Sequence, residues 1–215
     1  MYSHGCQRVG HGGASSLAPA NTLASFDAAL EVGVDMVEFD VRRYRGELIL
    51  AHTIFHSRLP LRLDEALAHL STPRFEAVDL NVDLKRPGCE ASLLDALRRW
   101  ELLERTLISS QFSAVLDRVR ALEPSARVGI SVGGRVARMS RRWRDWRTHV
   151  LAGLASRRWD ALMAQHRLID EALLNDVSAC RGLLYAWTVN EREVLDRLLG
   201  LGVDGIATGD PRLFA

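Results

Sequence analysis

The sequence Met-Val-Glu-Phe-Asp-Val-Arg at Met36–Arg42 is the clearest indication of the architecture. Apolar and polar residues alternate along it, which is the period of a β-strand with two different faces. Because every second side chain of a strand points the same way, Glu38 and Asp40 project together from one face. Two such carboxylates are ligands suited to a hard divalent cation.

Short β-like runs alternate with helical runs along the rest of the chain. Strands are expected at residues 7–11, 36–42, 48–51, 77–85, 106–109, 127–132, 161–165, 183–188 and 205–208. Such alternation indicates a parallel sheet in an α/β protein, and about eight repeats indicate a TIM (β/α)8 barrel. We expect one domain over residues 1–215, because barrels of this length commonly form a single unit.

Composition excludes several other classes of protein. Hydrophobic residues make up 47% of the chain and charged residues 26%, as in a globular protein. A net charge of +1 gives no reason to expect a nucleic-acid partner. Cys6, Cys89 and Cys180 are too few and too scattered for a disulfide framework or a zinc site. The start of the chain lacks a signal-like apolar segment, and no apolar run is long enough to span a bilayer, so a cytoplasmic protein is expected.

Chemically active residues fall at the ends of the predicted strands. His11 ends the first strand and His52 follows the third. Asp83 and Lys85 lie two residues apart on the fourth, and Lys85 is the only lysine among 28 basic residues. In a TIM barrel these ends surround the active site, so the residues are expected to meet there. Two histidines could then act as a general acid and a general base.

These residues belong to longer motifs that resemble the glycerophosphodiester phosphodiesterase family. The likeness extends over nearly the whole chain and is most specific at the N-terminal end. The segments that carry it are Gly-His-Gly-Gly-Ala-Ser at 10–15, Ala-Pro-Ala-Asn-Thr-Leu-Ala-Ser-Phe at 18–26, Val-Glu-Phe-Asp-Val at 37–41, Asn-Val-Asp-Leu-Lys at 81–85, Ala-Trp-Thr-Val-Asn at 186–190 and Thr-Gly-Asp-Pro at 208–211.

The resemblance implies a TIM barrel that hydrolyses glycerophosphodiesters to glycerol 3-phosphate and an alcohol. By the same resemblance, a divalent cation, Mg²⁺ or Ca²⁺, is held by Glu38, Asp40 and Asp83. His11 and His52 match the general acid and base, in an order that the sequence leaves open. In the family a glycerol hydroxyl is thought to attack first, giving a cyclic phosphate that water opens.

The implied substrate contacts are Gly12, Lys85 and Trp187. Lys85 matches a lysine that contacts phosphate. Gly12 stands where the family usually has an arginine, so one phosphate contact is absent there. Trp187 is expected to form an apolar wall near the mouth or to pack in the core, with neither role favoured.

Other departures also distinguish this chain from the family pattern. Ala20 replaces a glutamate, Thr53 replaces an aspartate, and Asp83 stands where glutamate is usual. Asp83 with Lys85 is also similar to the related sphingomyelinase D enzymes. The family commonly inserts a small subdomain after the second histidine, but here only residues 56–61 separate that insertion point from the next helix, so we expect a compact barrel that lacks the subdomain.

Three alternatives remain at the level of sequence. The substrate could be a glycerophosphodiester, or a lysophospholipid or sphingolipid cleaved as by a phospholipase D, or the barrel could bind phosphodiesters without turnover. Arg135–Arg147 holds six arginines interleaved with Trp143 and Trp146. A solvated helix face packed through its tryptophans is the main interpretation of this segment, and weak contact with an anionic membrane surface is the second. The oligomeric state is left open.

Overall fold

The computed structural model describes residues 5–53, 60–133 and 140–215. Its strands follow the expected positions closely. They are β1 (Gln7–His11), β2 (Met36–Tyr44), β3 (Glu47–Leu50), β4 (Asp79–Leu84), β5 (Thr106–Ser110), β6 (Arg127–Val132), β7 (Ala161–Gln165), β8 (Leu183–Trp187) and β9 (Gly205–Thr208).

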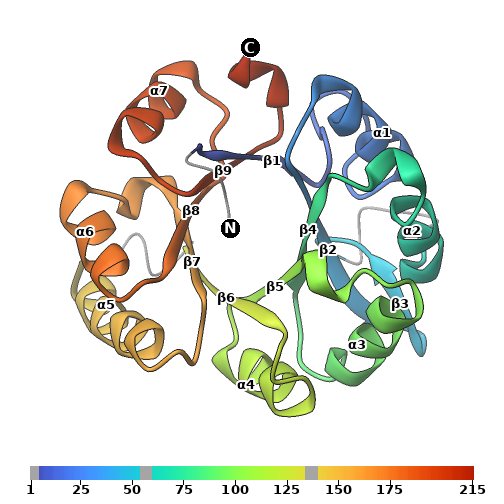
Figure 1. Ribbon diagram of the computed structural model, residues 1–215, viewed down its shortest axis with the longest axis horizontal. Coiled ribbons are helices and arrows are strands. Elements are labelled where there is room, and N and C mark those ends of the chain that lie inside the picture. Colours follow the sequence, from blue (N-terminus) through green and yellow to red (C-terminus); the bar gives the residue numbers. More distant parts are fainter. Residues whose placement is uncertain (1–4, 54–59, 134–139) are drawn as a thin grey trace.

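The sheet closes on itself as a parallel barrel. Its order is β1-β9-β8-β7-β6-β5-β4-β2-β3, and an additional β1–β2 pairing completes the ring. Strand β3 is not part of that ring, because it pairs only with β2 and runs antiparallel to it. The eight remaining strands form the closed ring seen in Figure 1, with the helices outside it. The prediction of a TIM barrel is confirmed.

The helices cover the outside of the ring. They are α1 (Leu23–Val32), α2 (Leu63–Leu70), α3 (Glu90–Arg99), α4 (Ser113–Leu122), α5 (Ser140–Ala155), α6 (Glu171–Ala179) and α7 (Arg192–Leu201), with 3-10 turns at Pro73–Phe75, Leu103–Arg105, His166–Leu168 and Pro211–Phe214. Only residues 51–62 separate β3 from α2, and of these the structure describes 51–53 and 60–62. Among the described residues, no helix combines the length and apolar character that crossing a bilayer requires.

Helix α1 shows how local sequence sets an element's ends. The side chain of Thr22 accepts the Ser25 backbone N–H, and Ser25 Oγ accepts the N–H of Thr22 in return. This capping box begins the helix at Thr22. Gly33 ends it in the left-handed region at φ 87°. Asn21, the residue before this cap, is hydrogen-bonded instead to Asp40.

Apolar side chains fill two layers. The larger cluster lies between the barrel and its helices and includes Phe26, Phe39 and Trp159. A smaller cluster fills the barrel interior around Val9, Met36 and Tyr185. Because this smaller cluster fills the barrel interior, the carboxyl ends of the strands surround a mouth whose floor is packed with side chains.

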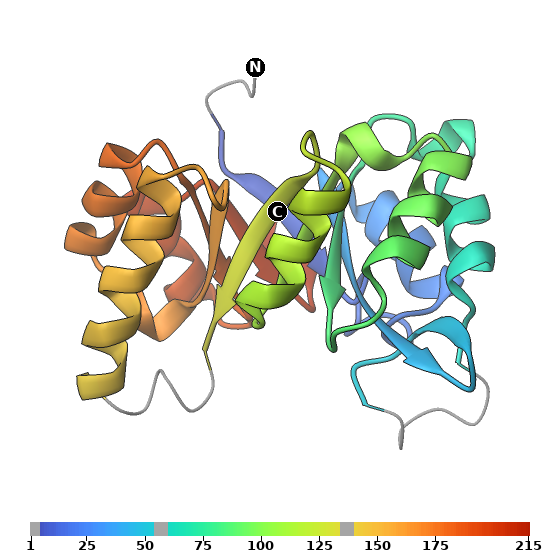
Figure 2. The ribbon, with the colours of Figure 1, turned by 90° about the horizontal axis from the view of Figure 1, so that it is seen from below.

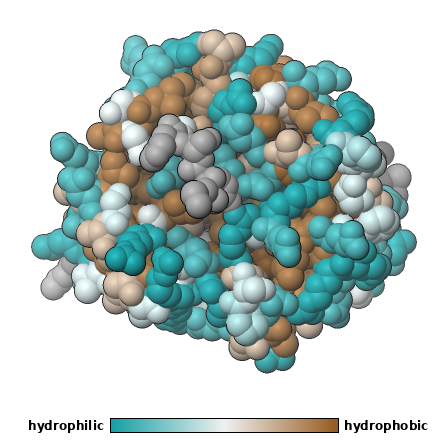
Figure 3. Space-filling model, in the orientation of Figure 1, coloured by the Kyte–Doolittle hydropathy of each residue, from teal (hydrophilic) through white to brown (hydrophobic). Residues whose placement is uncertain are grey.

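The two ends of the barrel differ. Strands β1 and β6 run downward in Figure 2, so the carboxyl ends of the parallel strands lie at the lower side of that view. Figure 3 shows the opposite face, around the amino ends, where hydrophilic and hydrophobic residues are interspersed. The predicted site residues belong to the lower side.

Candidate active site

A cavity of about 640 Å³ opens at the carboxyl ends of the strands. Six of the residues singled out from the sequence line it: His11, Glu38, His52, Asp83, Lys85 and Trp187. Residues far apart in the chain are therefore brought to one place, as the barrel topology requires. The other two predicted residues, Gly12 and Asp40, are buried.

Strand register explains why these side chains meet. His11 of β1 lies opposite Glu38 of β2. Asp40, two residues further along β2, lies opposite Asp83 of β4. Because opposed residues of parallel strands point to the same face, all four side chains project toward the barrel axis.

His11 and Glu38 form a pair. The His11 Nδ1 lies 3.0 Å from Glu38 Oε2, and the same carboxylate oxygen accepts the Gly12 N–H at 2.8 Å. Burial lowers the pKa of His11, but the charge and hydrogen bond of Glu38 outweigh it and raise this pKa to about 9. Burial likewise opposes ionisation of Glu38, yet His11, Lys85 and the Gly12 amide lower its pKa to about 2. The Gly12 amide is thus engaged within the protein.

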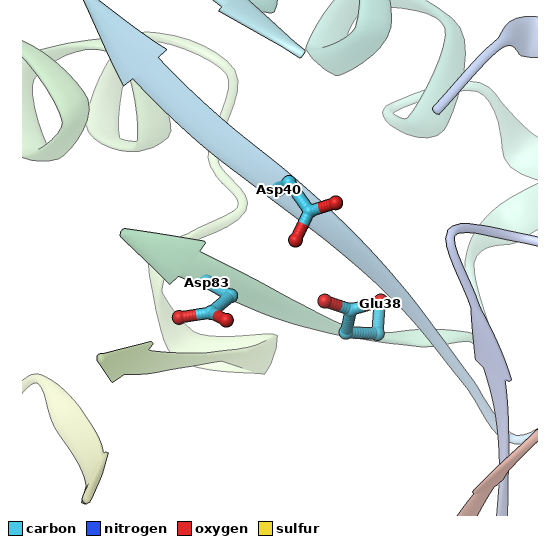
Figure 4. Close-up of side chains that lie close together, drawn as sticks. All are labelled: Glu38, Asp40 and Asp83. Atoms are coloured by element: carbon cyan, nitrogen blue, oxygen red, sulfur yellow. The ribbon is translucent and has the colours of Figure 1, made fainter. Parts of the chain in front are cut away.

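Three carboxylates gather beside this pair. Glu38, Asp40 and Asp83 each offer one oxygen, and these oxygens all lie within 4.8 Å of one another. Figure 4 shows the first two on β2 and the third on neighbouring β4. Burial raises the pKa of Asp83 to about 6, and repulsion by Glu38 and Asp40 adds to the effect, although Lys85 opposes it.

Lys85 lies directly after β4 and joins two of these carboxylates. Its Nζ is 2.6 Å from Asp40 Oδ1 and 2.5 Å from Asp83 Oδ2. Burial lowers the pKa of Lys85, but the attraction of Asp83, Asp40 and Glu38 outweighs it and raises the pKa above its usual value. The ammonium is therefore charged and held at the edge of the carboxylate cluster.

The carboxylate cluster could hold a metal ion. Its donors are all hard oxygens, which is the ligand type that Mg²⁺ and Ca²⁺ prefer. Two of the three residues, Glu38 and Asp40, are almost fully buried, so their negative charges lie close together with little solvent to screen them. A cation would offset this charge, and the residues present therefore fit a divalent ion.

Asn21 is a site residue that the sequence analysis included only within a family motif. Its side-chain amide donates to Asp40 Oδ2 at 2.9 Å, and its carbonyl oxygen accepts the Asp40 backbone N–H at 2.9 Å. Both bonds are buried, so Asn21 fixes the orientation of Asp40. The residue sits at φ 62°, a left-handed conformation that asparagine adopts more readily than most residues. The only sign of Asn21 in the sequence is its position two residues before the start of a helix, which does not indicate a contact with Asp40.

His52 reaches the cavity by a different route from His11. The antiparallel pairing of β3 with β2 returns the chain to the mouth, and the Ala51 N–H donates to the Asp40 carbonyl at 3.1 Å. His52 follows directly, is exposed, and lines the cavity. It therefore follows a strand as predicted, but that strand belongs to a hairpin outside the barrel ring.

The opposite side of the cavity is largely apolar. Val132, Trp146, Met163 and Trp187 line it, and Trp187 Nε1 donates to the Met163 carbonyl at 2.9 Å. Trp187 is half-buried, lines the cavity and also packs against the interior apolar cluster, so it combines features of both positions considered for it. Polar groups from β1, β2 and β4 thus face an aromatic and aliphatic wall from β6 to β8 and α5.

The basic segment Arg135–Arg147 lies partly outside the described residues. Of its described side chains, Trp143 and Trp146 are half-buried, and Trp143 packs against the outer core. Arg147 is paired with Asp176 at 2.7 Å, whereas Arg144 is exposed. The packed tryptophans agree with a solvated helix face on the barrel.

A closed parallel barrel with acidic, basic and imidazole groups at its mouth is the arrangement of a TIM-barrel enzyme. The model of the Glycerophosphoryl diester phosphodiesterase family matches residues 11–53 and 52–213. The chain belongs to this family, and the prediction that it is a phosphodiesterase of this kind is confirmed.

One curated relative resembles the chain in sequence, and two solved structures resemble it in fold. A glycerophosphodiester phosphodiesterase of Caldanaerobacter subterraneus is 25% identical over 238 aligned residues, covering 94% of this chain and 93% of that protein. The crystal structure of a glycerophosphodiester phosphodiesterase from Parabacteroides distasonis has a TM-score of 0.78 at 17% identity, covering 97% and 94% of the two chains. An Oleispira antarctica phosphodiesterase, solved with the product sn-glycerol-3-phosphate, has a TM-score of 0.78 at 23% identity, covering 96% and 94%.

Proposed function

We propose that this chain hydrolyses glycerophosphodiesters to glycerol 3-phosphate and an alcohol, with a divalent cation at Glu38, Asp40 and Asp83. We further propose that His11 and His52 are the general acid and base. The observation that carries the proposal is the shared cavity, which is lined by both histidines, Lys85 and two members of the carboxylate cluster, Glu38 and Asp83.

The His11–Glu38 contact supports a proton-transfer role. Because Glu38 occupies Nδ1, the Nε2 atom of His11 is the one left to face a substrate. Glu38 also fixes the ring, which reduces the reorganisation needed during a proton transfer. One histidine would take the proton from the attacking oxygen and the other would protonate the leaving alcohol.

Lys85 and the carboxylates would handle the charge of the phosphate. A phosphodiester is an anion that repels nucleophiles, so cationic groups beside it stabilise the negative charge that it gains. A divalent cation, when bound, supplies Lewis-acid stabilisation of that kind. Asp40 and Asp83 hold the Lys85 ammonium at the edge of the same space.

Phosphorus NMR tests the proposal directly. The purified chain is incubated with glycerophosphocholine and Mg²⁺ or Ca²⁺, and then with EDTA in place of the metal. We expect a glycerol phosphate or cyclic phosphate signal that EDTA abolishes and added metal restores. Tight binding of the substrate with no product in any condition would instead support a non-catalytic phosphodiester-binding barrel.

A Glu38→Gln variant tests the metal site separately. Metal binding to the folded state alone stabilises it by about 2.7 kcal/mol at a hundredfold excess over Kd, so Tm should rise with added ion. This rise should disappear in Glu38→Gln and persist in Asp95→Asn, whose side chain is exposed. An equal rise in Glu38→Gln would place the ion elsewhere.

The apolar wall supports a second candidate substrate class. Val132, Met163, Trp146 and Trp187 could accept an acyl chain, which favours phospholipase D-like action on a lysophospholipid. Lysophosphatidylcholine in the same NMR experiment separates the two classes. Faster turnover of the lysolipid than of glycerophosphocholine would favour the second candidate.

A further inference from the structure

Arg42 continues the inward-facing row of β2. Glu38, Asp40 and Arg42 alternate with apolar residues that pack against the outer helices, so the three share the face toward the barrel axis. Arg42 lines the same cavity as His11 and Lys85. Its Nε is buried and has no hydrogen-bond partner in the part of the chain that the structure describes.

The other cationic groups of the cavity are already engaged. Lys85 is bound by Asp40 and Asp83, and His11 is bound by Glu38. Arg86 is exposed, and its guanidinium lies 6.0 Å from the centre of the Phe112 ring. Among the described residues, neither Arg42 nor Arg86 forms a carboxylate pair, and of the two it is Arg42 that has a buried donor atom without a partner.

A buried donor without a partner is costly, so its retention at a binding cavity points to a ligand. An arginine fork matches the geometry of phosphate oxygens and can donate two parallel hydrogen bonds. The ligand that best fits Arg42 is thus an oxyanion positioned between it and the carboxylate–lysine cluster.

We propose that Arg42 binds a non-bridging phosphate oxygen of the substrate and so acts as an affinity-determining residue. This assignment rests on the proposed function, because it takes a phosphodiester as the ligand of the cavity. It adds a phosphate contact from β2 to the groups that β1 and β4 supply.

The neighbouring Arg43 provides a matched control. It lies on the other face of the same strand, is exposed, and donates to the Gly88 carbonyl at 2.9 Å and Ser92 Oγ at 3.0 Å. Arg43→Gln removes the same charge from the protein as Arg42→Gln, so any general effect of net charge is common to both variants.

Calorimetry with sn-glycerol 3-phosphate and with inorganic phosphate measures the contact. We expect Arg42→Gln to bind sn-glycerol 3-phosphate about 10- to 100-fold more weakly than wild type, the range for losing a charge-assisted hydrogen bond. The affinity of Arg42→Lys should lie between those of wild type and Arg42→Gln, because lysine keeps the charge but lacks the forked guanidinium. Arg43→Gln should bind as wild type does, and urea unfolding of each variant checks that it is folded.

Measurements of turnover test the Arg42–phosphate contact separately from the proposed hydrolysis. With glycerophosphocholine, Arg42→Gln should raise KM more than it lowers kcat, which a merely structural role would not do. If wild type binds the two phosphate probes through Arg42 but makes no product, the reaction fails and the phosphate contact stands. Wild-type affinity in both Arg42→Gln and Arg42→Lys, or no binding by wild type, would overturn the proposal.

Discussion

At the scale of single residues, the site depends on side chains that hold the reactive groups as well as on those groups themselves. Asn21 makes two buried hydrogen bonds to Asp40, one to its carboxylate and one to its backbone. Glu38 holds His11 and is itself held by the Gly12 amide. These contacts fix the ring and the carboxylates before any ligand arrives, which is how a site is preorganised.

Two substitutions of Asn21 separate the contribution of its side-chain amide from that of its left-handed backbone conformation. Asn21→Gly keeps the freedom to adopt φ 62° and removes only the amide, so we expect a loss of about 1–3 kcal/mol in unfolding free energy, the cost of unsatisfied buried groups. Asn21→Ala should lose roughly 1 kcal/mol more, because a Cβ disfavours that backbone conformation. Urea unfolding measures both. An Asn21→Gly protein as stable as wild type would show that Asp40 does not need the amide.

At the scale of elements, the strand positions and the parallel direction of the barrel strands could be predicted from the sequence, but the place of β3 outside the ring could not. Alternation along residues 36–42 identified β2 and its inward carboxylates. Residues 48–51 were also recognised as a strand, and the two-residue connection to β2 indicates an antiparallel hairpin, yet nothing local shows that this hairpin carries His52 to the mouth. That outcome depends on the Arg45–Gly46 turn, where both residues have positive φ, and on pairing with β2.

In the candidate site, too, some features could be predicted from the sequence and others could not. The roles of carboxylates and histidines followed from their types and from family motifs. The placement of Arg42 could have been predicted by extending the alternation of Glu38 and Asp40 by one step. The bond from Asn21 to Asp40 could not, because it requires a left-handed residue 19 positions away along the chain to lie beside β2.

Two glycines in helices should respond oppositely to alanine. A Cβ on Gly153 of α5 would lie 2.4 Å from ring atoms of the fully buried Trp159, so Gly153→Ala should cost about 1–3 kcal/mol by overpacking. A Cβ on exposed Gly200 of α7 meets nothing within 4 Å, so Gly200→Ala should stabilise by about 0.5–1 kcal/mol through helix propensity. Thermal and urea unfolding measure both changes, and the same sign for the two would contradict this packing.

At the scale of the whole molecule, the barrel brings the two ends of the chain together. Strand β1 pairs with β9 on one side and with β2 on the other, so closure joins the last strand to the first. The polar half of the cavity comes from early strands and the apolar half from later ones. Both halves therefore exist only when the ring is closed.

The pH dependence of stability tests one contact near this closure. Burial opposes ionisation of Asp35, but hydrogen bonds from the Arg8 side chain and backbone outweigh it and lower the pKa of Asp35 below its ordinary value. A lowered acid pKa adds stability above the unfolded-state pKa, and this stability is lost as pH falls through the folded-state value. Asp35→Asn should therefore lower the free energy of unfolding by about 1 kcal/mol near pH 7, and by less in acid. The value is modest because the Arg8 and Asp35 side chains are both more than a third exposed.

Unfolding in urea across pH provides the measurement. The exposed Asp95, which pairs with Arg98 at 3.3 Å, supplies a control in Asp95→Asn with little expected effect at any pH. A difference between Asp35→Asn and wild type that grows toward low pH would have the wrong sign for this account.

The central claim is that phosphodiester hydrolysis takes place in the cavity where His11 faces the carboxylate cluster. The most direct measurement is the turnover of glycerophosphocholine by His11→Ala beside wild type, with His149→Ala, an exposed histidine of α5, as the control. Loss of a general acid or base predicts a fall in kcat of roughly 10²–10⁴-fold for His11→Ala and none for His149→Ala. Near-normal turnover by a folded His11→Ala protein would contradict the account.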